Sequence, residues 1–233
     1  MLRKLIGPLI FGVGGFAILM SLGFWQVRRL AWKEGVLARI EARIHEAPGA
    51  LPVVPVAATD QYLPVSVTGH FSETGLRVLT SLKQIGPGHR LIRRFETGDR
   101  SILVDRGFLR DGTPAPELPT GDVTITGNLL WPDETDGYTP APDIAGGLWF
   151  ARDVSAMASS LGTEPVLLVA SDVSYDPGPV TPVPVSTEEI PNDHRNYAIT
   201  WFSLAAIWLA MTAFLFYRTL KGTKDSGTGG AAT

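Results

Sequence analysis

The sequence predicts a membrane-anchored α+β protein in which two transmembrane helices flank a small antiparallel β-barrel or sandwich with one short helix. Two runs without a formal charge, residues 5–27 and 197–217, are 23 and 21 residues long. About 20 apolar residues are enough for a helix to cross the hydrocarbon of a bilayer. Between these runs, apolar and polar residues alternate in short segments bounded by glycine and proline, which is typical of strands with one buried face.

The first uncharged run, residues 5–27, is expected to remain as a membrane span. It is longer than the roughly 7–15-residue apolar region of a cleaved signal peptide. Arg28 and Arg29 follow it, and no small-residue cleavage site separates them from the run. Small residues let two helices approach closely in a membrane. The five glycines at positions 7, 12, 14, 15 and 23 therefore favour packing on a second span.

A juxtamembrane helix, residues 28–46, is expected to continue the first span. Apolar residues recur at a spacing of three to four until Pro48 forbids helix. Trp25 and Trp32 lie seven residues apart on the same predicted edge. Trp25 is either an anchor at the membrane interface, as tryptophans are in many spans, or part of a binding site.

Residues 63–175 are expected to form the β-rich soluble domain. Strand patterns occur at 63–71, 77–82, 91–95, 101–108, 123–130, 147–150 and 165–173. One short helix is predicted at 153–161, with Asp153 as its N-cap and Gly162 after its end. Residues 176–191 carry five prolines and are expected to form an extended linker.

Composition and motifs argue against several function classes. The chain has no cysteine and a net charge of −3, so disulfides and thiolate metal sites are absent and nucleic acid is not an expected partner. Glycine-rich phosphate loops, nucleophile elbows and metal-binding HExxH helices are all missing from the sequence, so no enzyme activity is expected. The polar cluster Asp105-Arg106-Gly107 is either a functional site or a structural turn in which Gly107 supplies backbone freedom.

The start of the second span has an unusual polar residue. His194 lies just before the uncharged run, at the expected depth of the lipid headgroups. On a helix, His194, Tyr197 and Trp201 share one face. A possible metal ligand therefore precedes an aromatic stripe that enters the membrane, although His194 could instead only help Asn192 or Asp193 cap the helix.

Two segments resemble the terminal motifs of the surfeit locus protein 1 family. They are LGFWQVRRLAWK at residues 22–33 and NDHRNYAITWF at residues 192–202. Segments at 65–71, 104–108 and 123–129 fall where that family has similar strands, so the resemblance spans nearly the whole chain. Members of the family are assembly factors for cytochrome c oxidase that act on subunit I around haem insertion, and bacterial members are similar to haem-a-binding proteins.

The resemblance implies that this chain binds haem a and has cytochrome c oxidase subunit I as a partner, with haem a synthase as a further candidate. Haem iron accepts a histidine as axial ligand, and the motif places His194 in that role. Trp25, Tyr197 and Trp201 would flank the ring. The propionates would lie near one of the cations close to the membrane surface, which are Arg28, Arg29, Lys33 and Arg195. A structural scaffold that holds subunit I without binding haem is the alternative function.

The expected location is a bacterial inner membrane, crossed twice. No Arg- and Ser-rich transit sequence precedes the first run. Arg3 and Lys4 at one end, and Arg218, Lys221 and Lys224 at the other, favour a cytoplasmic location for both termini. The soluble domain would then lie in the periplasm.

Overall fold

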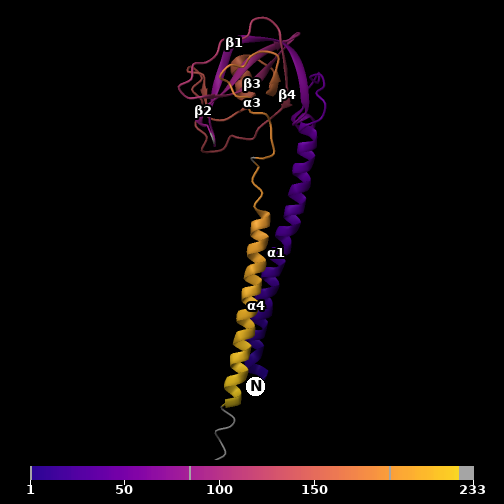
Figure 1. The fold of residues 1–233 in the computed structure, drawn as a ribbon, viewed down its shortest axis with the longest axis vertical. Helices are drawn as coiled ribbons and strands as arrows, with labels where there is room; N and C mark the ends of the chain where they lie inside the picture. The colour runs from indigo at the N-terminus through magenta and orange to yellow at the C-terminus, as the bar shows by residue number, and fades with distance from the viewer. Residues whose placement is uncertain (1, 84, 189, 226–233) are drawn as a thin grey trace, which may run out of the picture. The chain divides into compact units, whose positions relative to one another are not determined.

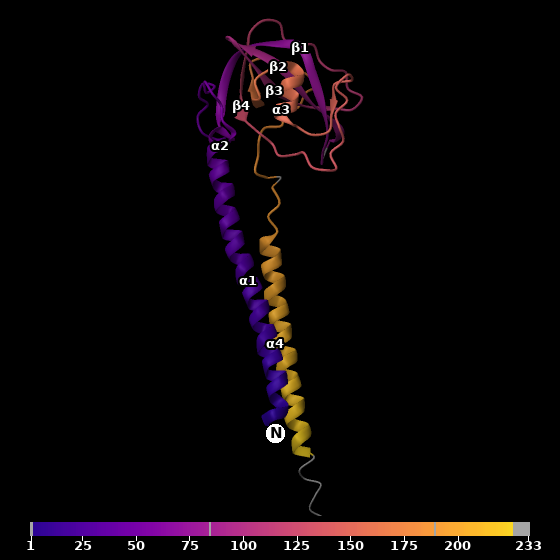
Figure 2. The same ribbon diagram turned by 180° about the vertical axis from the view of Figure 1, so that it is seen from behind.

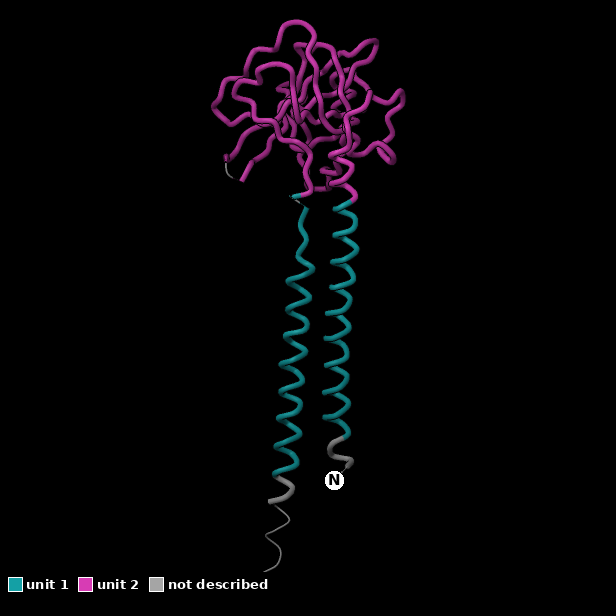
Figure 3. Tube along the Cα trace, turned by 45° about the vertical axis from the view of Figure 1, so that its right-hand side comes forward, with its two compact units in different colours: residues 1–38, 188–233 teal, residues 39–187 magenta. Residues whose placement is uncertain are grey.

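The computed structural model describes residues 2–83, 85–188 and 190–225. The chain divides into two compact units, coloured separately in Figure 3. One unit is helical and comprises residues 1–38 and 188–233. The other comprises residues 39–187 and holds all the strands. The membrane-anchored α+β class predicted from the sequence is confirmed.

Two long helices, α1 (Leu2–Ile44) and α4 (His194–Asp225), run side by side in the helical unit (Figures 1 and 2). Both contain a segment that is long and apolar enough to cross a membrane, with a mean hydropathy of 1.9. This is consistent with a two-pass membrane protein. The predicted first span and its juxtamembrane extension form one continuous helix, because no proline occurs between Pro8 and Pro48.

Glycines let α1 and α4 approach closely along their shared length. A Cβ atom added to Gly12, Gly15 or Gly23 would lie within 2.5 Å of a side chain of α4. Gly7 and Gly14 face open space instead. The indole of Trp208 donates a hydrogen bond of 2.9 Å to the carbonyl oxygen of Gly12. These contacts pair the start of one helix with the end of the other, so the two helices are antiparallel.

The end of α1 belongs to the strand-bearing unit. Ile44 is buried, and its carbonyl oxygen accepts a hydrogen bond of 3.0 Å from the buried side chain of Asn128. Nearby, the Thr187 hydroxyl donates to Glu41 at 2.7 Å. A short helix, α2 (Ala57–Asp60), follows this turn of the chain.

The sheet consists of six strands, most of them visible in Figure 1. They are β1 (Pro64–Leu82), β2 (Gly86–Thr97), β3 (Arg100–Arg110), β4 (Val123–Leu129), β5 (Leu148–Trp149) and β6 (Leu167–Val173). The order is β2-β3-β6-β4-β1-β5, and β1 also pairs with β2. Five strands therefore close into a barrel, and the short strand β5 pairs alongside the second part of β1.

Strand β1 closes the barrel because it changes partner along its length. Its first part pairs with β4 and its second part with β2, and the register shifts between Phe71 and Gly75. The sequence predicts two separate strands here, whereas the structure has one long strand. Most pairs are antiparallel as expected, but β3–β6 and β1–β5 are parallel. The chain segment that contains α3 lies between β4 and β6 and allows the parallel β3–β6 pairing.

Two apolar clusters form the core of this unit. The first draws buried residues from all five barrel strands, including Phe95, Ile102 and Ile125, and fills the barrel. The second lies between the sheet and α3 (Val154–Leu161) and is centred on Met157, which is fully buried. The predicted ends of α3 are confirmed, because Asp153 accepts a hydrogen bond from the Ala156 amide and Gly162 adopts a left-handed conformation.

The proline-rich segment after β6 is attached to the barrel instead of running free. Thr181 exchanges two backbone hydrogen bonds of 2.8 Å with Phe108, and Val180 is buried. Gly107 allows this close approach, since it has a φ of +117° and a Cβ there would lie 2.3 Å from the Thr181 oxygen. Residue 189 of the predicted linker lies outside the described residues.

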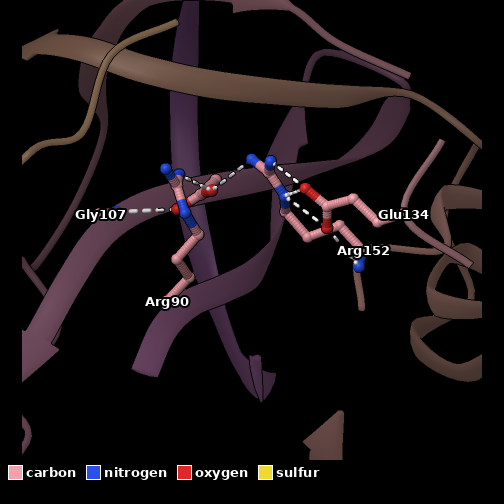
Figure 4. A network of polar contacts seen from close by, with 5 residues as sticks. Arg90, Gly107, Glu134 and Arg152 are labelled. Carbon is pink, nitrogen blue, oxygen red and sulfur yellow. Dashed lines mark hydrogen bonds and ion pairs between the residues drawn. The ribbon is translucent and has the colours of Figure 1, made fainter. Parts of the chain in front are cut away.

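A buried ionic network links β2, β3 and the segment before α3 (Figure 4). The Asp105 side chain is fully buried, and its carboxylate accepts from Arg90 at 2.6 Å and from the Gly107 amide at 3.0 Å. Arg152 lies 3.7 Å from the same carboxylate and forms several bonds with Glu134. Each of these charged groups has a partner of opposite sign, so this cluster serves the structure of the barrel.

Candidate functional site

The candidate site lies within the helical unit, where α4 begins beside α1. His194 is the first residue of α4, and its Nδ1 lies 2.8 Å from Oε1 of Gln26. Gln26 is 7% exposed, although it is polar and lies only two residues before the arginine pair that ends the uncharged run. The two residues are 168 positions apart in the chain, so this hydrogen bond joins two segments that are distant in the sequence.

A second contact holds the chain just before α4. Lys33 donates a hydrogen bond from its ammonium group to the carbonyl oxygen of Pro191. Gln26 and Lys33 are seven residues apart, and two helical turns bring them to the same face of α1. The segment that carries His194 is therefore fastened to α1 on both sides of residue 192.

The contacts of His194 differ from those expected of a capping residue. The first turn of α4 is closed by a backbone hydrogen bond of 3.1 Å from the Tyr197 amide to the Asp193 carbonyl oxygen. The Asn192 side-chain oxygen is buried and has no hydrogen-bond partner among the described residues. The ring of His194 reaches across to α1 instead. An imidazole held in this way has one nitrogen engaged and the other available for a ligand.

The predicted aromatic residues are accessible around this contact. Trp25 is 51% exposed and Tyr197 is 55% exposed, while Trp201 is partly buried. Exposed aromatic rings at the end of a membrane span can line a binding surface or anchor the helix in the headgroup region.

Helix geometry places several of these residues on one flank of the pair. Successive helical residues are rotated by about 100°. Arg29 and Tyr197 each come three residues after the contacting residue of their own helix. In an antiparallel pair, such equivalent positions lie on the same flank. Trp25, one residue before Gln26, is rotated to that flank as well, whereas Trp201 lies closer to the line of contact.

Arg29 is also positioned by an aromatic neighbour. Its guanidinium carbon lies 4.0 Å from the centre of the Trp32 ring, which is a cation–π contact. Trp32 itself is exposed. The arginine is therefore held beside the flank described above, and its guanidinium has no hydrogen bond or ion pair with any other residue that the structure describes.

Free metal ions have no evident site in the part of the chain that the structure describes. No group of three or more His, Cys, Asp or Glu side chains lies close enough there to hold one. A single histidine suits a metal that brings its other ligands with it, as haem iron does.

Comparison with known proteins agrees with the terminal motifs. The sequence model of the SURF1 family matches residues 14–206. The chain belongs to the SURF1 family. Surfeit locus protein 1 of Rattus norvegicus is 29% identical over 226 residues, which cover 87% of this chain and 72% of the relative. The SURF1-like protein of Monosiga brevicollis is 31% identical over 229 residues, covering 90% and 87%. Surfeit locus protein 1 of Xenopus tropicalis is 30% identical, covering 80% and 68%.

Sequence reasoning did not assign a role to Gln26 in this SURF1 family protein. Gln26 is the fifth residue of the first terminal motif, next to Trp25, and polarity alone does not show which face of a helix it occupies. One available signal is its phase relative to the glycines. The steps from Gly12 to Gly15, from Gly15 to Gly23 and from Gly23 to Gln26 are three, eight and three residues. Steps of this size keep all four residues on one side of a helix, which places Gln26 on the face that packs against α4.

Proposed function

We propose that this protein is a membrane-bound assembly factor for cytochrome c oxidase that binds haem a and assists its insertion into subunit I. Membership of the SURF1 family supports the assembly role. The observation that carries haem binding is the state of His194. Its Nδ1 is hydrogen-bonded to Gln26, and Nε2 has no hydrogen-bond partner within the described residues. That leaves a nitrogen lone pair for iron.

The residues around His194 fit a haem a group. The porphyrin supplies four nitrogen ligands to iron, so one protein histidine is enough to fix it. Trp25, Tyr197 and Trp201 provide aromatic surface for the ring. Arg29 provides a charge for a propionate, and guanidinium groups pair well with carboxylates. At headgroup depth, the isoprenoid tail of haem a can remain in lipid.

The proposed location is a bacterial inner membrane with the barrel in the periplasm and both termini in the cytoplasm. Arg218 and Lys221 follow the second span and support this orientation. The side chains of the other terminal cations, Arg3, Lys4 and Lys224, lie outside the described residues. An alkaline phosphatase fusion within residues 132–146 should be active, and an inactive fusion would reverse the orientation.

A structural scaffold is the second candidate function. The hydrogen bond between Gln26 and His194 also links α1 to α4, and such a link could serve only to hold the helix pair together. The protein would then stabilise subunit I while haem a arrives by another route, for example directly from haem a synthase. The two candidates differ in what His194 must do.

The deciding experiment uses cells that make haem a and cytochrome c oxidase but lack this protein. Wild type, His194→Ala and His45→Ala are returned to these cells, and both the amount of subunit I and its haem a content are measured. His45 is a suitable control because its side chain is 71% exposed and, among the described residues, bonds only to Glu41 at the end of α1. The proposal predicts that His194→Ala leaves subunit I poor in haem a, whereas His45→Ala behaves as wild type. Full haem occupancy with His194→Ala would favour the scaffold.

A second experiment tests the proposed flank. Trp25→Ala or Trp32→Ala should lower the ratio of bound haem to protein while the amount of membrane-inserted protein stays near normal. Burial of a large apolar side chain against a ligand is worth about 1.5–3 kcal/mol, which corresponds to a loss of about 10-fold or more in affinity. If these variants lose protein but keep the ratio, the tryptophans are anchors in the membrane interface.

A further inference from the structure

Gln26 is a buried polar side chain with one clear hydrogen bond to a candidate iron ligand. Its Oε1 atom faces Nδ1 of His194 at 2.8 Å, and 93% of the residue's surface is covered. Burying a polar amide between two helices costs free energy unless the amide is hydrogen-bonded. The hydrogen bond to His194 therefore offsets the cost of burying the Gln26 side chain.

The direction of this hydrogen bond determines the tautomer of the imidazole. A carbonyl oxygen can only accept, so Nδ1 must carry the hydrogen. In a neutral imidazole that leaves Nε2 with the lone pair. We propose that Gln26 is a positioning residue that holds His194 in the Nδ1–H tautomer and thereby presents Nε2 to a ligand.

The two contacts on α1 make this arrangement rigid. Gln26 fixes the ring of His194, and Lys33 fixes the backbone three residues earlier through Pro191. A histidine on a free chain end would rotate about its side-chain bonds and exchange tautomers. Here the ring direction and the tautomer are both set before any ligand binds.

The consequence for haem rests on the proposed function. Histidine ligands commonly donate their second ring N–H to a fixed acceptor, and loss of that acceptor typically weakens metal binding by about 10–100-fold. The acceptor also tunes the iron. A carboxylate at position 26 would draw the Nδ1 hydrogen more strongly than an amide does, increase electron donation by Nε2 and lower the reduction potential of the bound haem.

The test begins with the full-length, haem-free protein in detergent, labelled with nitrogen-15 in histidine. Nuclear magnetic resonance distinguishes protonated from unprotonated ring nitrogens. Wild type should show a protonated Nδ1 and an unprotonated Nε2 for His194. Gln26→Glu keeps an acceptor and should keep this tautomer, whereas Gln26→Met has a similar shape without the oxygen and should lose the preference.

Two results would overturn the proposal. One is a wild-type protein in which Nε2 carries the hydrogen and Nδ1 does not, because Gln26 would then be the donor. The other is a Gln26→Met protein with the wild-type tautomer. If Gln26→Met fails to fold, Gln26→Glu takes its place, and a Gln26→Glu protein whose Nδ1 carries no hydrogen would overturn the proposal as well.

Haem titration separates this inference from the proposed function. If haem a binds, Gln26→Met should weaken binding about 10–100-fold, and Gln26→Glu should shift the reduction potential to a more negative value. If the tautomer is as expected but neither wild type nor variants bind haem a, the inference about Gln26 stands and the haem proposal fails.

Discussion

Removing the carboxylate of Asp105 should destabilise the barrel strongly. Asp105→Ala would leave the guanidinium of Arg90, whose side chain is only 13% exposed, without its bond of 2.6 Å. It would also leave the Gly107 amide without its acceptor. Breaking a buried ion pair by removing one partner costs about 3–5 kcal/mol. That is a large part of the roughly 5–15 kcal/mol by which a domain is stable.

A matched control is available at the end of the same strand pair, where Asp111 directly follows β3. Asp111 pairs with His89 at 3.0 Å, but its side chain is 45% exposed. Ion pairs at the surface contribute about 0–1 kcal/mol, so Asp111→Ala should change stability little. The double variant Asp105→Leu with Arg90→Met should recover most of the loss, because apolar residues often replace a buried ion pair without cost.

The assay is pulse proteolysis of the full-length protein in detergent across a urea series, following the fragment that holds residues 39–187. With a urea dependence of about 2 kcal/mol per molar, Asp105→Ala should lower the midpoint by about 1.5–2.5 M. Asp111→Ala should lower it by less than about 0.5 M. Equal midpoints for the two single variants would refute the claim that the buried network stabilises the barrel.

Three further predictions concern acid, helix packing and strand packing. Burial raises the pKa of Glu134, but its bonds with the Arg152 guanidinium outweigh burial and hold the pKa below its usual value. The stability that the ionised Glu134 contributes should therefore be complete above about pH 5 and disappear as pH falls through the lower folded-state pKa. Glu134→Gln should consequently reduce the loss of urea midpoint between about pH 7 and pH 4. Gly15→Val should increase the α1–α4 distance measured between spin labels on two introduced cysteines, whereas Gly14→Val, which faces open space, should not. Gly69→Val should lower protein abundance, because a Cβ there would lie 1.8 Å from a backbone oxygen of β2, and Gly137→Val, with nothing within 4 Å, should be neutral.

Each of these three predictions would be contradicted by one simple result. The acid prediction is wrong if Glu134→Gln has the same pH profile as wild type. The helix prediction is wrong if both glycine variants give the wild-type distance. The strand prediction is wrong if Gly69→Val accumulates to the wild-type level.

Local patterns were enough to predict the two long helices, α3 and most of the strand segments, but not α2 or the joining of two predicted strands into β1. Two uncharged runs of sufficient length predict membrane helices whatever the rest of the chain does. Alternation around Val65 and Val67 predicts a strand with one buried face, and both side chains are buried in the barrel. Asp153 and Gly162 mark the ends of α3, because their roles as caps depend only on neighbouring backbone groups.

Pairings between distant segments could not be predicted in the same way. The parallel pairing of β3 with β6 depends on where the intervening chain packs, and no local pattern encodes that. The attachment of Thr181 to Phe108 was missed because proline-rich composition is typical of linkers. The contact of Gln26 with His194 was missed for a related reason, since the two residues are 168 positions apart.

The most direct test of haem binding is the absorption spectrum of the full-length protein purified from cells that make haem a. We expect a haem a spectrum for wild type and for His45→Ala, and loss of that spectrum for His194→Ala at an equal yield of protein. A colourless wild-type protein from those cells, or a His194→Ala protein with undiminished haem a, would contradict the assignment of His194 as the iron ligand.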